Sequence, residues 1–361
     1  MFEHKNILIL IGNGFDIANG METKFSDFAN NYLDKIIIPE LIRVRKGDCD
    51  KSLILSDPFF KNWNAKGTYN LPNKSYLSLW NSYDNHDMIR NEILNDYKKL
   101  NLILRNKFLA KLYSTESKNW FDIENLYFKN LIGLKKSVSV PGSSIKPLQN
   151  LNVNFNEVKT AVIDYLANIE VELDRSIAGF IQHHLEDLEN LYFLNFNYTS
   201  TVLNYKHHIR TLQGCVINHI HGDFSRREDI VFGYGNDQNS EYQEIKSLEI
   251  DEFLRYFKTF DYLNNSHYDH LHNEFLNKYE NFEVVVLGHS LGQTDKTLLS
   301  EIFNSASCKK IHFFKRSDLA HEPSLVRQNF RELGYAASRI INSEADLRNK
   351  VVNFEDSKYF P

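Results

Sequence analysis

Cysteine is scarce in this chain, with only three among 361 residues. Cys49, Cys215 and Cys308 stand far apart and form no C-x-x-C pair, so the sequence indicates neither a disulfide framework nor a zinc knuckle. A composition of this kind fits a protein of the reducing cytosol. We therefore expect a cytoplasmic protein without structural disulfides.

Excess positive charge and long apolar runs are also missing. The formal net charge is −5 and the Lys and Arg residues are scattered, which leaves no basic patch for a nucleic-acid backbone. The N-terminus lacks a signal-like segment, and no apolar run approaches the roughly 20 residues that cross a bilayer. We expect no nucleic-acid partner, no membrane segment and no export. A hydrophobic content of 42% instead predicts a globular protein with a sizeable core.

What the chain does contain is a set of short, β-branched apolar runs, which are typical of buried parallel strands. The predicted strands are residues 7–11, 191–196, 216–220, 230–232, 282–287 and 310–314. Helical patterns follow several of these runs, at residues 16–33, 295–305 and 325–333. Strands that alternate with helices predict an α/β fold with a mostly parallel, Rossmann-like sheet.

Residues 36–190 give little strand signal and contain aromatic-rich amphipathic segments instead. The clearest of these is 155–188, where apolar residues recur at helical spacing. A Ser, Pro and Gly stretch at 137–147 predicts an exposed loop. We therefore predict a core of residues 1–35 and 191–361, interrupted by a large helical insertion or cap at 36–190. A second helical excursion is expected at about 236–281.

The first predicted strand ends in Gly12-Asn13-Gly14. Where a strand turns into a helix, unpaired N–H groups attract an anion, and glycine lets a ligand approach the backbone. Ile17 replaces the third glycine of the dinucleotide fingerprint, and the Walker lysine is missing, so neither a dehydrogenase nor a P-loop NTPase is supported. Two interpretations remain: a cradle that offers bare amides to a phosphate, and a tight turn without a ligand.

A second glycine turn, Gly288-His289-Ser290-Leu291-Gly292, matches G-x-S-x-G after a strand. In an esterase Ser290 would be the nucleophile, with Asp318 and His321 as its acid and base. Alternatively, Gly288 and Ser290 contact a ribose or phosphate, with Asp295 one helical turn further on. A plain turn is the third interpretation.

Amide and imidazole groups follow two further predicted strands, at Asn197 and at His219 and His221. The carboxyl ends of parallel strands share one edge of a sheet, so we expect these groups at the edge that carries the Gly12 turn. His221 is favoured as the functional imidazole because it stands at the rim. A buried, hydrogen-bonded core position is favoured for His219.

Two other clusters carry weaker signals. His267, His270 and His272 match no zinc-protease spacing, and a solvated helical face is favoured over a metal site. Asp122 and Glu124 would share a face on extended chain and diverge on a helix. An acid–base pair and a solvated pair beside a buried Trp therefore both stay open.

The motifs form an ordered set that resembles a known family. The set comprises Ile11-Gly12-Asn13-Gly14-Phe15-Asp16, Thr23 with Phe25-Ser26-Asp27-Phe28, Trp120-x-Asp122-x-Glu124, Phe196-Asn197-Tyr198-Thr199, His219-Ile220-His221-Gly222 and Gly288-His289-Ser290-Leu291-x-x-x-Asp295. In order and approximate spacing it is similar to the AbiH family of bacteriophage abortive-infection proteins. The resemblance implies antiphage defence, with activity held silent until self-assembly or a phage-derived trigger releases it.

More remotely, the set is similar to the sirtuin-like NAD-cleaving effectors of bacterial defence. By that resemblance Asn197 is the catalytic amide, His221 is the catalytic imidazole, and NAD is the substrate, cleaved without a metal at its nicotinamide–ribose bond. The residues implied to bind the nucleotide are Gly12, Asn13, Gly14, Phe15, Asp16, Thr23, Gly288, Ser290 and Asp295. A nucleotide sensor without catalysis and a serine hydrolase at Ser290 are the alternatives.

Overall fold

The computed structural model describes residues 2–45, 85–115, 120–140, 142–171, 173–185, 188–209 and 211–361. The chain divides into two compact units. The first, here called the sheet unit, comprises Met1–Thr23 and Ile163–Pro361, and the second, the helical unit, comprises Lys24–Val162. Cys49 lies outside the described residues.

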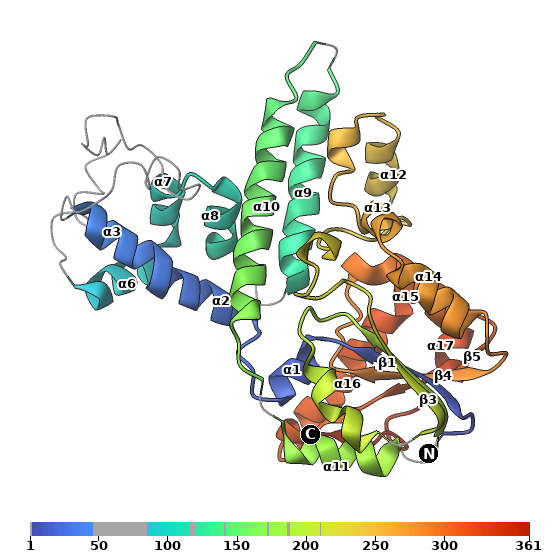
Figure 1. Ribbon diagram of the computed structural model, residues 1–361. Helices are drawn as coiled ribbons and strands as arrows, with labels where there is room; N and C mark the ends of the chain where they lie inside the picture. Colours follow the sequence, from blue (N-terminus) through green and yellow to red (C-terminus); the bar gives the residue numbers. More distant parts are fainter. Residues whose placement is uncertain are drawn as a thin grey trace. The chain divides into compact units, whose positions relative to one another are not determined.

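Five parallel strands form the sheet, in the order β3-β2-β1-β4-β5 (Figure 1). Their bounds are β1 Asn6–Ile11, β2 Leu188–Asn195, β3 Thr211–His219, β4 Phe282–Leu287 and β5 Cys308–Phe313. The α/β class and the parallel sheet are thus as predicted. The chain builds outward from β1 to β3 and then continues on the other side with β4, so the strand order reverses between β1 and β4. In open α/β sheets, ligands bind outside the carboxyl ends of the strands at such a reversal.

Helices cover both faces of this sheet, because its central strands are apolar on both sides. Leu8 and Leu10 of β1 join a buried cluster with α14, α15 and α16, whereas Ile7 and Ile9 join a second cluster with α11. Helix α11 falls within the range 36–190 that the sequence assigned to the insertion, yet it packs on the sheet.

The sheet unit contains mostly short helices. They are α1 Asn13–Ala18, α11 Arg175–His184, α12 Ser240–Lys246, α13 Lys258–Asp261, α14 His267–Leu271, α15 Lys296–Asn304, α16 Pro323–Ser338 and α17 Glu344–Lys350, with a small strand pair β6 Lys315–Arg316 and β7 Tyr359–Phe360. The helical unit contains α2 Phe25–Tyr32, α3 Ile38–Arg45, α6 His86–Asn95, α7 Leu100–Ile103, α8 Lys107–Ser114 and α9 Trp120–Val138. Helix α10, Lys146–Ala167, includes the boundary between the units.

Aromatic packing holds the helical unit together. Tyr127 of α9 stacks on Phe155 of α10 with ring centroids 4.1 Å apart, and its hydroxyl donates to Asn152 Oδ1 at 2.6 Å. Asp122 and Glu124 lie on α9, so they diverge around a helix and form no paired-carboxylate face.

Three predicted elements are wrong in extent or kind. The helix expected over 16–33 is two helices, because Gly20 adopts φ +75° and ends α1 in the manner of a C-terminal glycine cap. The pattern over 155–188 is likewise split, since Asp174 caps a new helix by accepting the amides of Ser176 and Ile177. Residues 230–232 are buried but belong to no strand. A three-residue apolar run records burial, which is not enough to specify strand pairing.

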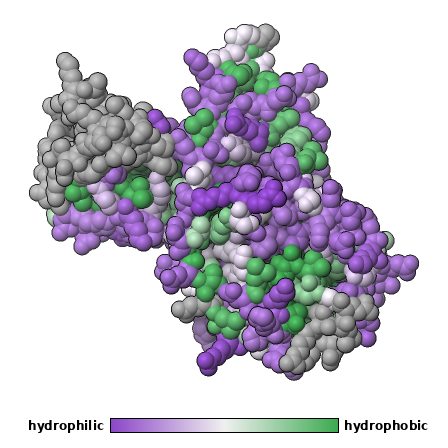
Figure 2. Space-filling view, viewed as in Figure 1, coloured by the Kyte–Doolittle hydropathy of each residue, from purple (hydrophilic) through white to green (hydrophobic). Residues whose placement is uncertain are grey.

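The outer surface is mainly hydrophilic on the face drawn in Figure 2, with hydrophobic residues in separate patches. None of the helices in the described part of the chain is long and apolar enough to cross a membrane. Cys215 and Cys308 are free thiols, and burial raises the pKa of Cys215 to about 11 and that of Cys308 to about 12. Neither thiol is therefore poised as a nucleophile.

Candidate functional site

Four predicted site segments lie at the carboxyl edge of the sheet. Gly12 follows β1, Asn197 follows β2, His221 follows β3 and Gly288 follows β4. Because the strands are parallel, their carboxyl ends share one edge. The side-chain amide of Asn197 donates to the carbonyl of Gly12 at 3.0 Å, which joins two of the segments directly.

The two glycine turns pack against each other backbone to backbone. The amide of Gly12 donates to the Leu287 carbonyl at 3.1 Å, and the amide of Gly14 donates to the Gly288 carbonyl at 2.9 Å. A Cβ added to Gly12 would lie 2.5 Å from the Cα of His289. The expectation of bare amides is therefore wrong for Gly12 and Gly14, because the close approach of the two turns uses those amides. Glycine is needed here for that approach.

The remaining residues of the first turn are held by hydrogen bonds and by burial. The side-chain amide of Asn13 donates to the Thr23 carbonyl at 3.0 Å, and Phe15 is buried in the core. The Thr199 hydroxyl donates to Asp16 Oδ2 at 2.5 Å. Burial raises the pKa of Asp16 to about 6, against the lowering effect of that hydrogen bond.

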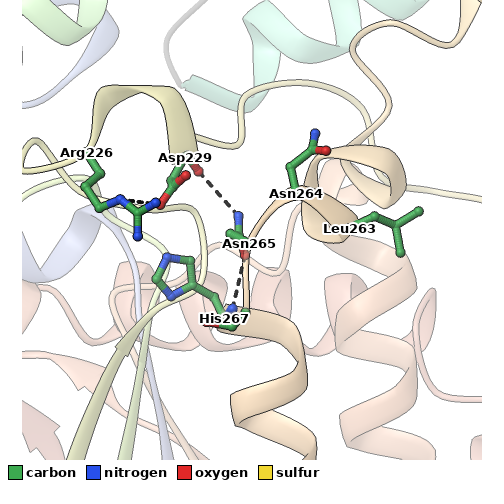
Figure 3. A pocket seen from close by; sticks show the side chains of 7 residues that line it. Arg226, Asp229, Leu263, Asn264, Asn265 and His267 are labelled. Atoms are coloured by element: carbon green, nitrogen blue, oxygen red, sulfur yellow. Dashed lines mark hydrogen bonds and ion pairs between the residues drawn. The ribbon is translucent and has the colours of Figure 1, made fainter.

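A polar cavity of about 340 Å³ lies between the segment that follows β3 and the segment that leads into α14 (Figure 3). It is lined by Arg226, Asp229, Leu263, Asn264, Asn265, Ser266 and His267. Arg226 Nε and Asp229 Oδ2 form an ion pair at 3.1 Å within the segment that follows β3. None of the sequence-predicted site residues lines this cavity, but its wall adjoins Tyr262, which contacts His221.

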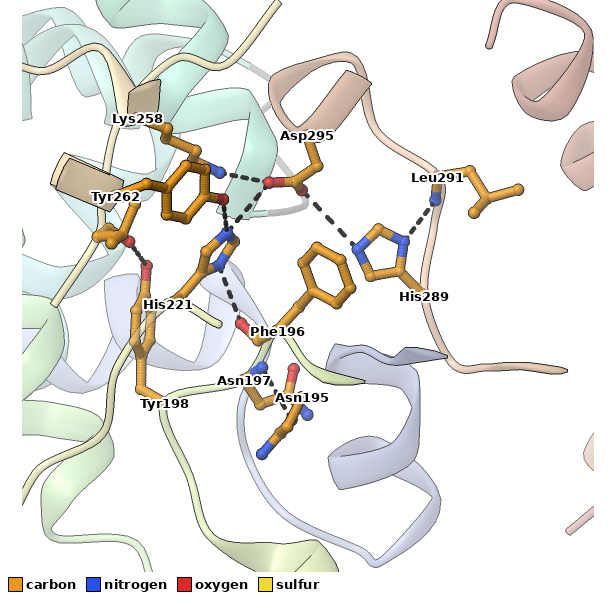
Figure 4. Close-up of polar contacts among 11 residues, drawn as sticks. Asn195, Phe196, Asn197, Tyr198, His221, Lys258, Tyr262, His289, Leu291 and Asp295 are labelled. Carbon is orange, nitrogen blue, oxygen red and sulfur yellow. Dashed lines mark hydrogen bonds and ion pairs between the residues drawn. The ribbon is translucent and has the colours of Figure 1, made fainter. Parts of the chain in front are cut away.

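A buried polar network surrounds His221 (Figure 4). Nδ1 of His221 lies 3.2 Å from the carbonyl oxygen of Phe196. Nε2 lies 3.2 Å from the hydroxyl of Tyr262 and 3.2 Å from Oδ1 of Asp295. Since a carbonyl oxygen can only accept, Nδ1 carries a proton and Nε2 is the acceptor of the neutral ring.

Asp295 lies at the centre of the network. Its Oδ1 is 2.6 Å from Nζ of Lys258, and its Oδ2 is 3.8 Å from Nε2 of His289. Burial alone would raise the pKa of Asp295, but the positive charge of Lys258 lowers it below its ordinary value. Asp295 is therefore ionised and paired with the Lys258 ammonium.

Both histidines of the network are neutral at neutral pH. Burial lowers the pKa of His221, and the Lys258 cation lowers it further. Burial also lowers the pKa of His289 to about 4, and Nδ1 of His289 accepts the amide of Leu291 at 3.0 Å. The site thus combines one anion, one cation and two neutral imidazoles, and His221 has a basic nitrogen beside a carboxylate.

Three members of this network were missed from the sequence: Lys258, Tyr262 and His289, the last of which lies between the predicted residues Gly288 and Ser290. Lys258 and Tyr262 come from the 236–281 excursion, which is indeed helical in several short pieces. The one signal for Lys258 is its position in the run Arg255-Tyr256-Phe257-Lys258-Thr259-Phe260, where a charged residue stands among aromatics. Buried lysines are rare and are paired when they occur, so a lysine in such a position predicts a carboxylate partner.

The serine-hydrolase arrangement is not assembled. Ser290 is exposed, Asp318 pairs with Arg316 at 2.5 Å, and His321 pairs with Glu322 at 3.3 Å. No contact joins Ser290 to Asp318 or His321, all of which are described residues.

His219 and the histidines of 267–272 have structural partners. Nδ1 of the buried His219 lies 3.2 Å from the side-chain amide of Asn195, as expected of a core histidine. His270 contacts the Tyr192 hydroxyl at 2.8 Å. No group of three potential ligands able to hold a metal ion occurs within the described ranges.

Comparison with curated proteins and with solved structures finds no match for this chain. A family model described as "Bacteriophage abortive infection AbiH" does match it, over residues 8–315. The match contains all the strand ends that build the site, from Gly12 to Asp295. The chain therefore belongs to the AbiH family, which implies a role in abortive-infection defence against bacteriophage.

Proposed function

We propose that this protein acts in abortive infection by hydrolysing the nicotinamide–ribose bond of NAD. The strand order β3-β2-β1-β4-β5 supports a Rossmann-like fold, in which a dinucleotide lies across the reversal between β1 and β4. The turns of Gly14 and Gly288 meet at that reversal. NAD as the ligand rests on the resemblance to sirtuin-like effectors.

Hydrolysis of the nicotinamide–ribose bond requires a general base and a rigidly held ribose. Hydrolysis breaks the bond between the nicotinamide nitrogen and the ribose through an oxocarbenium-like state, and water supplies the new C–O bond. The products are nicotinamide, ADP-ribose and a proton. A general base that removes the proton from water contributes roughly 10²–10⁴ to the rate.

The observation that carries the proposal is the state of His221. Its Nδ1–H is fixed by the Phe196 carbonyl, so its Nε2 is the basic atom, and that atom faces the ionised Asp295 at 3.2 Å. On receiving a proton, Nε2 would form an ion pair with Asp295. The base is thus held in one tautomer with a carboxylate ready to stabilise its charged form.

Asn197 and the glycine turns would position the nucleotide. The Asn197 amide nitrogen is already bonded to the Gly12 carbonyl, so its oxygen is the atom that would accept a ribose hydroxyl. Gly14 is half-buried at the turn, and the exposed hydroxyl of Ser290 would reach the pyrophosphate or the far ribose.

The direct test is nicotinamide release from NAD by purified protein, alone and with phage lysate. We expect release by the wild type and its loss in His221→Ala. His321→Ala is the matched control, because His321 is an exposed histidine paired only with Glu322 among the contacts of the described chain. Equal release by wild type and His221→Ala, or no release under either condition, contradicts the proposal.

A nucleotide sensor without catalysis is the second candidate. It is favoured by the internal hydrogen bonds of the Gly12, Gly14 and Asn197 amides, which hold this edge rigid independently of His221. A sensor would keep phage protection in His221→Ala and lose it in Gly14→Val. The hydrolase would lose protection in both variants.

A further inference from the structure

Lys258 is among the most deeply buried charged groups of the described chain, with 1% of its surface exposed. It begins the short helix α13, and its Nζ reaches Oδ1 of Asp295, 37 positions away, at 2.6 Å. Lysine is almost never buried to this extent without a paired anion, because removing an ammonium from water is expensive. The burial of this cation is therefore explained by its ion pair with Asp295.

One oxygen of Asp295 serves two groups. Oδ1 lies 2.6 Å from Lys258 Nζ and 3.2 Å from His221 Nε2, so the ammonium and the imidazole share the same acceptor (Figure 4). Without Lys258 the buried carboxylate would face His221 with its full charge. A lone buried carboxylate favours protonation of a neighbouring imidazole, because an ion pair has a lower free energy than an unpaired buried anion.

The other groups around His221 cannot take over this role. His289, on the far side of Asp295, is neutral because burial lowers its pKa to about 4. Tyr262, from the turn before α14, and Tyr198, from the segment after β2, present phenol rings to the imidazole. Among the described groups that face His221, the charge balance is thus set by Asp295 and Lys258.

The geometry points to Lys258 as a positioning residue that compensates the charge of Asp295 and thereby keeps His221 neutral, with Nε2 unprotonated. Its importance for turnover rests on the proposed function. The charge state of His221 does not, and it can be measured without any substrate.

The experiment is a histidine NMR titration of the full-length protein in the absence of NAD. Because the chain has 14 histidines, the His221 signal is assigned as the one missing in His221→Gln. In the wild type we expect His221 to stay neutral at neutral pH. In Lys258→Met, which keeps an unbranched side chain one atom shorter and removes its charge, we expect the titration midpoint of His221 to rise by about one pH unit or more.

A double variant separates charge from packing. Lys258→Met combined with Asp295→Asn leaves neither buried charge, so His221 should return to the neutral state of the wild type. If Lys258→Met fails to fold, Lys258→Gln retains a hydrogen-bond donor for Asp295 and should give the same rise. Lys278→Met, at an exposed lysine that pairs with Glu274, is the control and should leave His221 unchanged.

An unchanged His221 midpoint in a folded Lys258→Met or Lys258→Gln protein overturns the inference. So does a rise that persists in the double variant, because it would come from altered packing. If wild type releases nicotinamide, Lys258→Met should lose activity severalfold at neutral pH and regain it at higher pH. Absence of release in all variants would defeat the proposed function and leave the NMR result to decide the role of Lys258.

Discussion

Gly14 and Gly288 meet backbone to backbone, with the Gly14 amide donating to the Gly288 carbonyl at 2.9 Å. This contact joins the ends of β1 and β4, the two strands between which the sheet order reverses. A Cβ on Gly288 would lie 2.2 Å from the amide nitrogen of Phe15, and Gly288 has φ +71°. Both the space and the backbone conformation therefore require glycine.

Gly288→Ala should lower the free energy of unfolding by about 3 kcal/mol or more, since left-handed backbone costs roughly 1–2 kcal/mol and the overlap adds to it. Denaturant titration followed by circular dichroism measures the change. The control is Gly334→Ala in α16, where an added Cβ meets nothing within 4 Å. Alanine there should stabilise the protein by about 0.5–1 kcal/mol. Equal stability of Gly288→Ala and wild type would contradict the tight contact.

Asp16 should weaken the fold as pH rises. Burial raises its pKa from 3.8 to about 6, so its contribution is fully present below about pH 4 and is lost as pH rises through 6. Asp16→Asn keeps the hydrogen bond from Thr199 and removes the ionisation. The free energy of unfolding of wild type should fall relative to that of the variant by about 2–3 kcal/mol as the pH rises from acidic to slightly alkaline. Thermal melts across this range test it, with the exposed Asp269→Asn as the control. Parallel curves for Asp16→Asn and wild type would refute it.

Glu283, at the other end of the sheet, should have the opposite effect on the pH dependence of stability. Its buried carboxylate accepts the amides of Glu3 and His4, each at 2.7 Å, and contacts Nε2 of His312 at 2.5 Å. Burial would raise the pKa of Glu283, but these bonds lower it overall, with His312 the largest contributor. Its contribution is therefore present above the unfolded value of about 4.3 and is lost as pH falls through the lower folded value.

Glu283→Gln should cost about 2–4 kcal/mol at neutral pH, because its new amide group faces other donors. The free energy of unfolding should also fall less steeply on acidification in the variant than in wild type. Urea titrations at neutral and acidic pH measure both effects, with the exposed Glu280→Gln as the control. A variant as stable as wild type at neutral pH would show that the carboxylate is not needed there.

The sheet and the gathering of its strand ends follow from the sequence for a simple reason. A β-branched run such as residues 282–287 specifies a buried strand locally, and parallel strands bring the residues after them to one edge whatever the loops do. Asn197 and His221 could therefore be expected near Gly12. The helix breaks were harder, because Gly20 and Asp174 interrupt patterns whose apolar spacing continues across them.

The network around His221 could not be derived in the same way. Lys258 and Tyr262 reach the site from a segment of short helices whose path is set by tertiary packing and by no local pattern. Asp295 was expected to contact a nucleotide, and its contacts with Lys258 and His221 became visible only in three dimensions. The prediction of bare amides in the first turn was wrong for a related reason. The amide of Gly14 donates to Gly288, which is 274 positions away, and no local pattern indicates that contact.

Tyr262 occupies the one atom of His221 that the proposed reaction needs. Its hydroxyl lies 3.2 Å from Nε2, so in this state a water or ribose hydroxyl has to displace the phenol before it can give up a proton. Tyr262→Phe keeps the ring that lies parallel to the imidazole and removes the competing hydroxyl. We expect basal nicotinamide release to rise severalfold in Tyr262→Phe, measured without phage lysate, because the base is no longer masked.

The gain should vanish when His221→Ala is added to Tyr262→Phe, which shows that the released activity uses the same imidazole. Tyr335→Phe, at an exposed tyrosine of α16, controls for the loss of a hydroxyl elsewhere. A fall in release in Tyr262→Phe would instead assign the phenol a supporting role in catalysis. A rise would mean that the silent state demanded by abortive infection is built in part from one hydrogen bond, which a trigger that shifts the turn at Tyr262–Asn264 could break.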